Sequence, residues 1–95
     1  MGATWTRITT SQVVSKVPSL LRSVVVTPNS ESKKGSVTLY DGESTSDPEL
    51  YVIRAGIGET KQVIFDVPLS CQRGLYVVLG AHVDECLLQW ELPKT

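Results

Sequence analysis

The sequence has little of the material from which catalytic and metal centres are usually built. Its 95 residues include one histidine, two cysteines and one methionine, and its formal net charge is −1. Such a small charge gives no electrostatic reason to expect nucleic acid as a partner. No apolar run approaches the length of a membrane span, so we expect no membrane partner. The length allows a single domain, and the composition by itself indicates no chemistry.

Two cysteines, Cys71 and Cys86, are too few for a disulfide scaffold. If Leu75–Leu79 and Leu87–Glu91 form a hairpin, the residue opposite Cys86 lies near Gly80, so the two thiols do not meet. We therefore expect both cysteines to be reduced and partly buried, as small apolar residues are, which suits assembly in a reducing cytosol.

The composition is typical of a β protein. Thirteen valines and nine threonines stand against three alanines. No window of twelve or more residues sustains a helical apolar period, whereas several alternate with period two. The pattern predicts six strands, at residues 21–27, 36–41, 49–55, 62–67, 74–79 and 83–92.

The predicted strands recur every 10–14 residues with turn signals between them. Asp41 and Gly42 open a loop that closes at Asp47 and Pro48, and Pro68 is expected to end its strand because proline cannot donate to a ladder. This spacing predicts an all-β fold, a small antiparallel β-sandwich or jelly roll of six to seven strands.

The first nineteen residues differ from the rest. Trp5 and Ile8 are their main large apolar residues, and Gln12–Val17 could add a seventh strand. We expect residues 1–19 to form an extended N-terminal arm or an edge strand and residues 20–95 a single β-sandwich domain. A frayed tail is the alternative. An arm could cover an exposed sheet edge on another copy by strand addition.

The only histidine offers weak evidence for chemistry. His82 is followed by Asp84 and Glu85, whereas a zinc site needs three or four convergent ligands, so a polar turn is the favoured interpretation. A dyad of Cys71 and His82 has no supporting motif. We expect no catalytic, cofactor-binding or metal-binding residues, no cofactor, and no enzymatic activity.

Three acidic residues cluster in one predicted loop, Asp41, Glu43 and Asp47. Their oxygens could hold Ca²⁺, but the spacing is not that of an EF-hand. Aspartate before glycine or proline is an ordinary turn former, so a turn is the favoured interpretation.

Five aromatic residues are available for a surface, namely Trp5, Tyr40, Tyr51, Tyr76 and Trp90. Tyr40 and Tyr76 fall on the faces opposite the main apolar sets of their strands. They could stack sugar rings, but packing between subunits is favoured. We expect Trp5, Tyr51 and Tyr76 to be interface residues.

Three segments together resemble a known group of proteins. In the order Ser23–Val26, Gly35–Gly42 and Cys71–Val77, a valine strand is followed by a G-x-V-x-L-Y-D-G hairpin and a G-L-Y-V strand. This order resembles small structural proteins of tailed bacteriophage virions, of the capsid-decoration or tail-accessory type. The matching positions are turn glycines and core apolar residues, so the resemblance implies a virion component and transfers no functional residue.

The leading hypothesis is a non-enzymatic structural protein of a phage particle that decorates or cements the capsid and bridges its subunits. Its partners would be copies of itself, in a closed homo-oligomer such as a trimer, and the major capsid protein or other virion proteins. It would be assembled in the host cytoplasm and located in the virion. The alternative is a carbohydrate- or receptor-binding module on a tail or fibre.

Overall fold

The computed structural model describes residues 4–28, 35–55, 59–80 and 82–93, and the statements below concern these residues. All of their regular structure is β-strand. The eight strands are β1 (Thr4–Ile8), β2 (Gln12–Ser15), β3 (Ser19–Pro28), β4 (Gly35–Tyr40), β5 (Glu49–Ala55), β6 (Lys61–Cys71), β7 (Leu75–Leu79) and β8 (Val83–Glu91).

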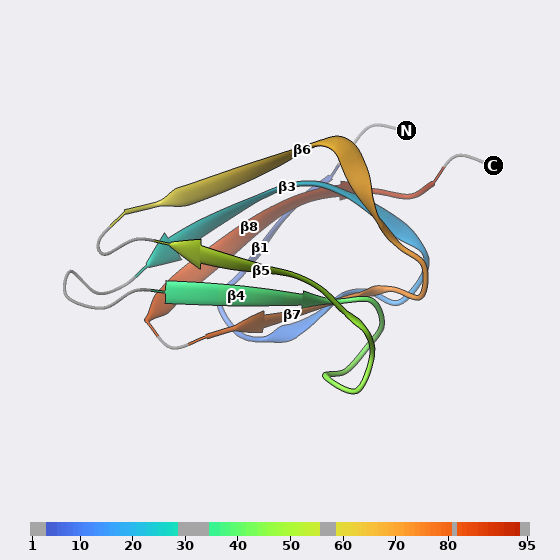
Figure 1. Cartoon of the computed structure of the whole chain (residues 1–95), viewed down its shortest axis with the longest axis horizontal. Helices are drawn as coiled ribbons and strands as arrows, with labels where there is room; N and C mark the ends of the chain where they lie inside the picture. Colours follow the sequence, from blue (N-terminus) through green and yellow to red (C-terminus); the bar gives the residue numbers. More distant parts are fainter. Residues whose placement is uncertain (1–3, 29–34, 56–58, 81, 94–95) are drawn as a thin grey trace.

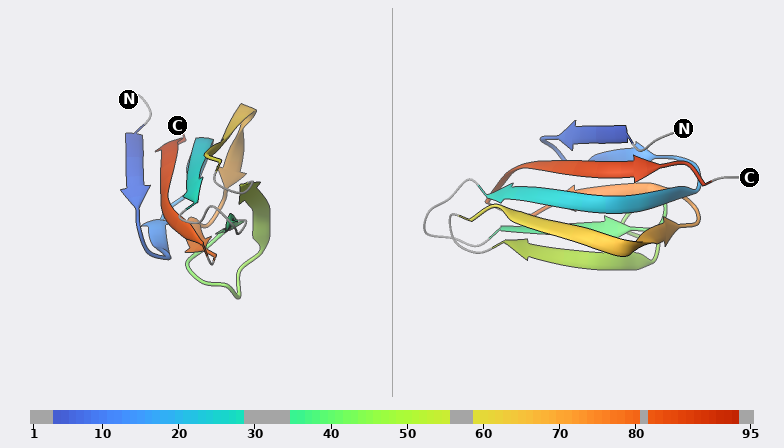
Figure 2. Two further views of the ribbon diagram at one scale, coloured as in Figure 1. Left: turned by 90° about the vertical axis from the view of Figure 1, so that its left-hand side faces the viewer. Right: turned by 90° about the horizontal axis from the view of Figure 1, so that it is seen from above.

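The strands form two four-stranded antiparallel sheets that pack face to face (Figures 1 and 2). Sheet A has the order β1-β8-β3-β6, and sheet B has the order β2-β7-β4-β5. The first strand pairs with the eighth, the second with the seventh, the third with the sixth and the fourth with the fifth. The chain is therefore a long antiparallel hairpin rolled into two layers, which is the arrangement of a jelly roll.

The core lies between the sheets and follows the predicted alternation. In β4 every second residue is buried, with Val37 and Leu39 fully covered. In β7 Leu75 and Val77 point inward, and in β8 Cys86 and Leu88 do so. Because side chains alternate between the two faces of a strand, the residues between these buried positions lie on the outer faces of the sheets.

The strand count of six to seven was too low, because the first segment forms two strands of its own. The described part of residues 1–19 takes the edge-strand alternative: β1 pairs with β8, and β2 pairs with β7, within the same chain. β1 escaped prediction because Thr4 and Thr6 occupy two of its three inward positions, the third being Ile8. Thr6 is suited to this place because its hydroxyl accepts a hydrogen bond from Trp90 Nε1, at 2.9 Å.

The hairpin considered for β7 and β8 does not form. The two strands lie in different sheets, so the chain crosses between the layers at His82, which has a φ of 66°. The crossing nevertheless leaves both cysteines free, as expected, and they are buried completely.

Pro68 does not end its strand either. β6 runs on to Cys71, because β6 is an edge strand and its pairing with β3 is interrupted between Ile64 and Leu69. Pro68 therefore falls where no ladder hydrogen bond to β3 is required of it.

No helix that could cross a membrane is found in the described part of the chain.

We predict that Leu88→Ala lowers the free energy of unfolding by about 2–5 kcal/mol, because it leaves a cavity in the core. Leu87→Ala is the matched control. This neighbouring leucine is half-buried on the outer face of the same strand, so its loss is expected to cost about 1 kcal/mol. Urea unfolding of both variants measures the difference, and equal losses would contradict the register of β8.

Candidate functional site

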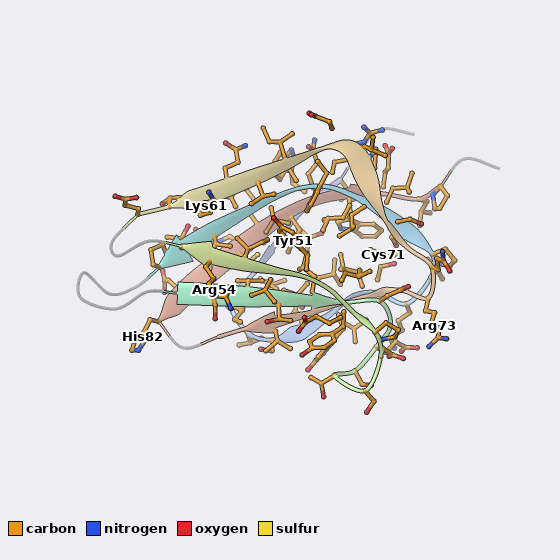
Figure 3. The ribbon with its side chains drawn as sticks, in the orientation of Figure 1. Tyr51, Arg54, Lys61, Cys71, Arg73 and His82 are labelled. Carbon is orange, nitrogen blue, oxygen red and sulfur yellow. The ribbon has the colours of Figure 1, made fainter. Side chains whose placement is uncertain are left out.

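Cys71 and His82 do not come together. Cys71 ends β6 and His82 precedes β8, and Figure 3 shows them at opposite ends of the sandwich. Burial raises the pKa of Cys71 to about 12, and the Asp41 carboxylate adds to this effect. Burial likewise raises the pKa of Cys86 to about 12. Since the thiolate is the nucleophilic form, neither cysteine is poised for nucleophilic chemistry near neutral pH.

Of the two acidic residues next to His82, one is exposed and the other forms an ion pair. His82 and Asp84 are exposed, whereas the carboxylate of Glu85 pairs with Arg7 on β1. Among the described residues, no group of three or more histidine, cysteine, aspartate or glutamate side chains could hold a metal ion.

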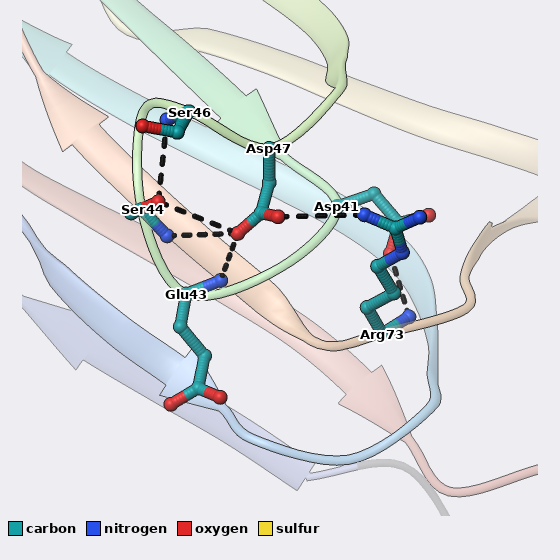
Figure 4. A network of polar contacts seen from close by, with 6 residues as sticks. All are labelled: Asp41, Glu43, Ser44, Ser46, Asp47 and Arg73. Carbon is teal, nitrogen blue, oxygen red and sulfur yellow. Dashed lines mark hydrogen bonds and ion pairs between the residues drawn. The ribbon is translucent and has the colours of Figure 1, made fainter.

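The acidic loop between β4 and β5 is a turn organised by one carboxylate (Figure 4). Asp47 Oδ2 accepts hydrogen bonds from the backbone amides of Glu43, at 2.8 Å, and Ser44, at 3.2 Å. The first of these bonds makes the largest contribution to lowering the pKa of Asp47 below its ordinary value of 3.8. Gly42 is required in this turn, because a Cβ there would lie 2.0 Å from the Asp47 carboxylate.

Arg73 fastens the same loop to the connection between β6 and β7. Its backbone amide donates to Asp41 Oδ1 at 2.7 Å, and its guanidinium lies 3.5 Å from Asp47 Oδ1. The carboxylates of Asp41 and Asp47 are thus engaged with backbone and guanidinium donors. The favoured interpretation of this cluster as a turn agrees with this geometry.

The outer face of sheet A is a broad, partly apolar surface. Two rows of directly paired residues cross it, and each row runs from β1 through β8 and β3 to β6. The first row is Trp5, Gln89, Ser23 and Ile64. The second row is Arg7, Leu87, Val25 and Gln62. Trp5 is 49% exposed and Ile64 is 67% exposed, while Leu87 and Val25 between them are half-buried. Exposed apolar groups gathered on one face are typical of an interaction surface.

Two ion pairs within the chain lie on the outer face of sheet A. Arg7 pairs with Glu85 towards one end of the strands, and Arg22 pairs with Glu91 towards the other. These exposed ion pairs add little to stability, but they leave the face with balanced charge.

The outer face of sheet B carries a second, more aromatic surface. Its first row of paired residues is Val13, Tyr76 and Tyr40, and its second row is Val78, Thr38 and Val52. All six residues are half-buried. The rings of Tyr40 and Tyr76 are tilted neighbours with centroids 6.2 Å apart.

Tyr51 lies on neither outer face. It is 44% exposed on the edge strand β5, where its ring meets Phe65 of the edge strand β6 edge-on, with centroids 5.7 Å apart (Figure 3). This contact joins the two sheets along one side of the sandwich. The three expected interface residues, Trp5, Tyr51 and Tyr76, therefore occupy three different surfaces.

Sequence reasoning missed the other residues of the outer face of sheet A. The signal was present in β6 and β8, where Ile64 stands between the inward positions Val63 and Phe65, and Leu87 stands between Cys86 and Leu88. What the sequence did not supply was the strand order that brings Ile64, Leu87 and Trp5 onto one sheet.

Comparisons with models of protein families, with curated proteins and with solved structures found no match.

We predict that a thiol reagent such as DTNB leaves Cys71 and Cys86 unmodified in the folded protein at pH 8. With both pKa values near 12, only about one thiol in ten thousand is ionised at that pH, and both sulfurs are covered. In denaturant two thiols are expected to react within minutes. Rapid modification of either thiol without unfolding would contradict the burial described above.

Proposed function

We propose that this chain is a non-enzymatic structural component of a tailed-phage particle, and that it decorates or cements the capsid. Its partners are the major capsid protein or other virion proteins, and its location is the virion. It acts mechanically, by bridging neighbouring subunits and burying apolar surface when it docks.

The observation that carries this proposal is the character of the two outer faces. A sheet that faces water on one side usually alternates apolar residues inward with polar residues outward. Here the outer face of sheet A contains Trp5, Leu87 and Ile64, and that of sheet B contains a pair of tyrosines. A module with apolar groups on both outer faces is suited to being packed between other proteins.

The fold agrees with the proposal by analogy. Jelly rolls are used for viral capsid domains and for lectins. The segments that resemble phage structural proteins fall in β3, β4, β7 and the adjoining turns, and these three strands have a neighbour on both sides in their sheets. The resemblance therefore concerns the centre of the fold, whereas docking uses the outer faces.

We assign the particle contact to the outer face of sheet B. Tyrosine combines a large apolar ring with a polar tip, and aromatic residues are enriched among the energetically important residues of interfaces. Tyr40 and Tyr76 lie side by side, so one docked subunit can cover both rings. Docking stabilises the folded form and the shell together, because a partner that binds only folded protein shifts the unfolding equilibrium.

The test uses particles of the source phage. We expect mass spectrometry of purified particles to detect the chain at a fixed ratio to the major capsid protein. Added to particles that lack it, the protein should bind saturably, and the Tyr40→Ala/Tyr76→Ala double variant should bind at least about tenfold more weakly. Val67→Ala, at an 82% exposed position on β6 of the other sheet, is the control and should bind normally.

Urea unfolding verifies that the double variant is folded at the temperature of the binding assay. Absence of the chain from purified particles would overturn the proposal. Equal occupancy by the wild type and the folded double variant would overturn the assignment to sheet B.

A carbohydrate-binding module of a tail or fibre is the second candidate, and the tyrosine pair is the observation that favours it. Adjacent rings can stack on sugar faces, and jelly rolls include lectins. A glycan array distinguishes the two functions, since the structural proposal predicts no signal. A signal that the Tyr40→Ala/Tyr76→Ala variant loses would favour carbohydrate binding.

A further inference from the structure

We propose that the outer face of sheet A binds a second copy of this chain in a twofold-symmetric, face-to-face contact. The inference goes beyond the particle role and does not depend on it. It follows from how the residues of this face are distributed about the line between β8 and β3, the two central strands of the sheet.

The apolar residues of the face match one another across that line. Consider a twofold axis that runs parallel to the strands, above the face and between β8 and β3. A rotation of 180° about this axis places a second copy on the face with its strands in reversed order. It brings β1 over β6 of the second copy and β8 over β3. Trp5 then faces Ile64 of the second copy, and Leu87 faces Val25, with each contact made twice.

The charges match in the same orientation. Glu91 on β8 lies opposite Leu20 in the register and forms an ion pair with Arg22 of the same chain, so the rotation sets Glu91 over Leu20 of the second copy and brings the two ion pairs together with opposite charges facing. Arg7 faces the amide of Gln62, and Glu85 faces Thr27. No like charges oppose each other among these residues. A second copy therefore matches the face in its charges as well as in its apolar contacts.

The other twofold orientation is disfavoured. A twofold axis perpendicular to the strands would place β8 over β8 of the second copy, with the two strands running in opposite directions. Glu85 would then lie over Glu91 of the second copy. Two carboxylates brought together in an interface repel each other. The charges therefore select the axis parallel to the strands, and the aligned packing of two sheets is a common arrangement.

The size of the face sets the strength of the contact. Four strands about 4.8 Å apart and roughly six residues long cover a footprint of roughly 400 Å² on each copy. The two copies together cover roughly 800 Å², which is less than the roughly 1,000 Å² that stable interfaces exceed, so we expect a weak, reversible dimer whose midpoint lies at roughly 10 µM to 1 mM.

Sedimentation equilibrium of the full chain from about 5 µM to about 1 mM tests the contact. The mass of the wild type should rise from 10.4 kDa towards twice that value. Ile64→Glu, at a 67% exposed position, should weaken association at least about tenfold. The matched control is Val67→Glu, which lies in the same strand and is 82% exposed, but belongs to the part of β6 that does not pair with β3. This control should associate like the wild type.

A mixing experiment tests the orientation. Trp5→Lys and Ile64→Glu should each associate poorly alone. When the two are mixed, one contact regains tryptophan against isoleucine, and the other gains an ammonium opposite a carboxylate. We therefore expect the mixture to form a heterodimer at a concentration about tenfold lower than either variant needs by itself.

Acrylamide quenching of the wild type gives a measurement that requires no variant. Trp5 is 49% exposed in the single chain, so its quenching should fall as the protein associates. A mass that stays at 10.4 kDa up to 1 mM would overturn the inference. So would association that Ile64→Glu leaves unchanged, a mixture with no rescue, or a trimer that is insensitive to both variants.

Discussion

The rest of the molecule depends on one contact, the apolar layer between the two sheets. That layer is complete only because residues 4–15 supply an edge strand to each sheet. β1 adds Ile8, which is 1% exposed, to the core beside sheet A, and β2 then extends sheet B. In a domain of this size the core is small, so two strands form an appreciable part of it. The segment that the sequence suggested as an arm or an edge strand thus supplies edge strands to the sandwich, and a chain without residues 1–19 would lack a strand from both sheets.

Much of the fold could be predicted from alternation alone. The six strands expected after residue 20 are all present, and the hairpin at Gly35–Gly42 leads from β4 towards β5 in the same sheet. Alternation failed where a strand was short and polar on its inward side, as in β1. It also could not assign strands to sheets, because six of the seven connections cross between the layers. A local pairing rule therefore paired β7 with β8, although strands that are far apart in the sequence supply most of the pairing.

The candidate surfaces were also predictable only where they depend on alternation within a strand, and not where they depend on the order of strands in a sheet. The alternation of β4 and β7 correctly placed Tyr40 and Tyr76 opposite the core, and the register then made them neighbours. Trp5 and Ile64 come from the first strand and the sixth, so no sequence window could show that they share a face. The outer face of sheet A and that of sheet B lie on opposite sides of a thin sandwich. One molecule could therefore contact a second copy through the first and a different protein through the second, as a bridging component requires.

Native-state hydrogen exchange of the β1 amides tests most directly whether the chain completes its own sheets. If Thr4–Ile8 pairs with β8 of the same molecule, its ladder amides should exchange at least about a hundredfold more slowly than those of an unstructured peptide. This protection should already be present at about 20 µM protein, and association of folded copies at about 1 mM should only add to it. Exchange at unstructured rates, or protection that develops only at the higher concentration, would contradict the account, because β1 would then be free or would pair with another copy.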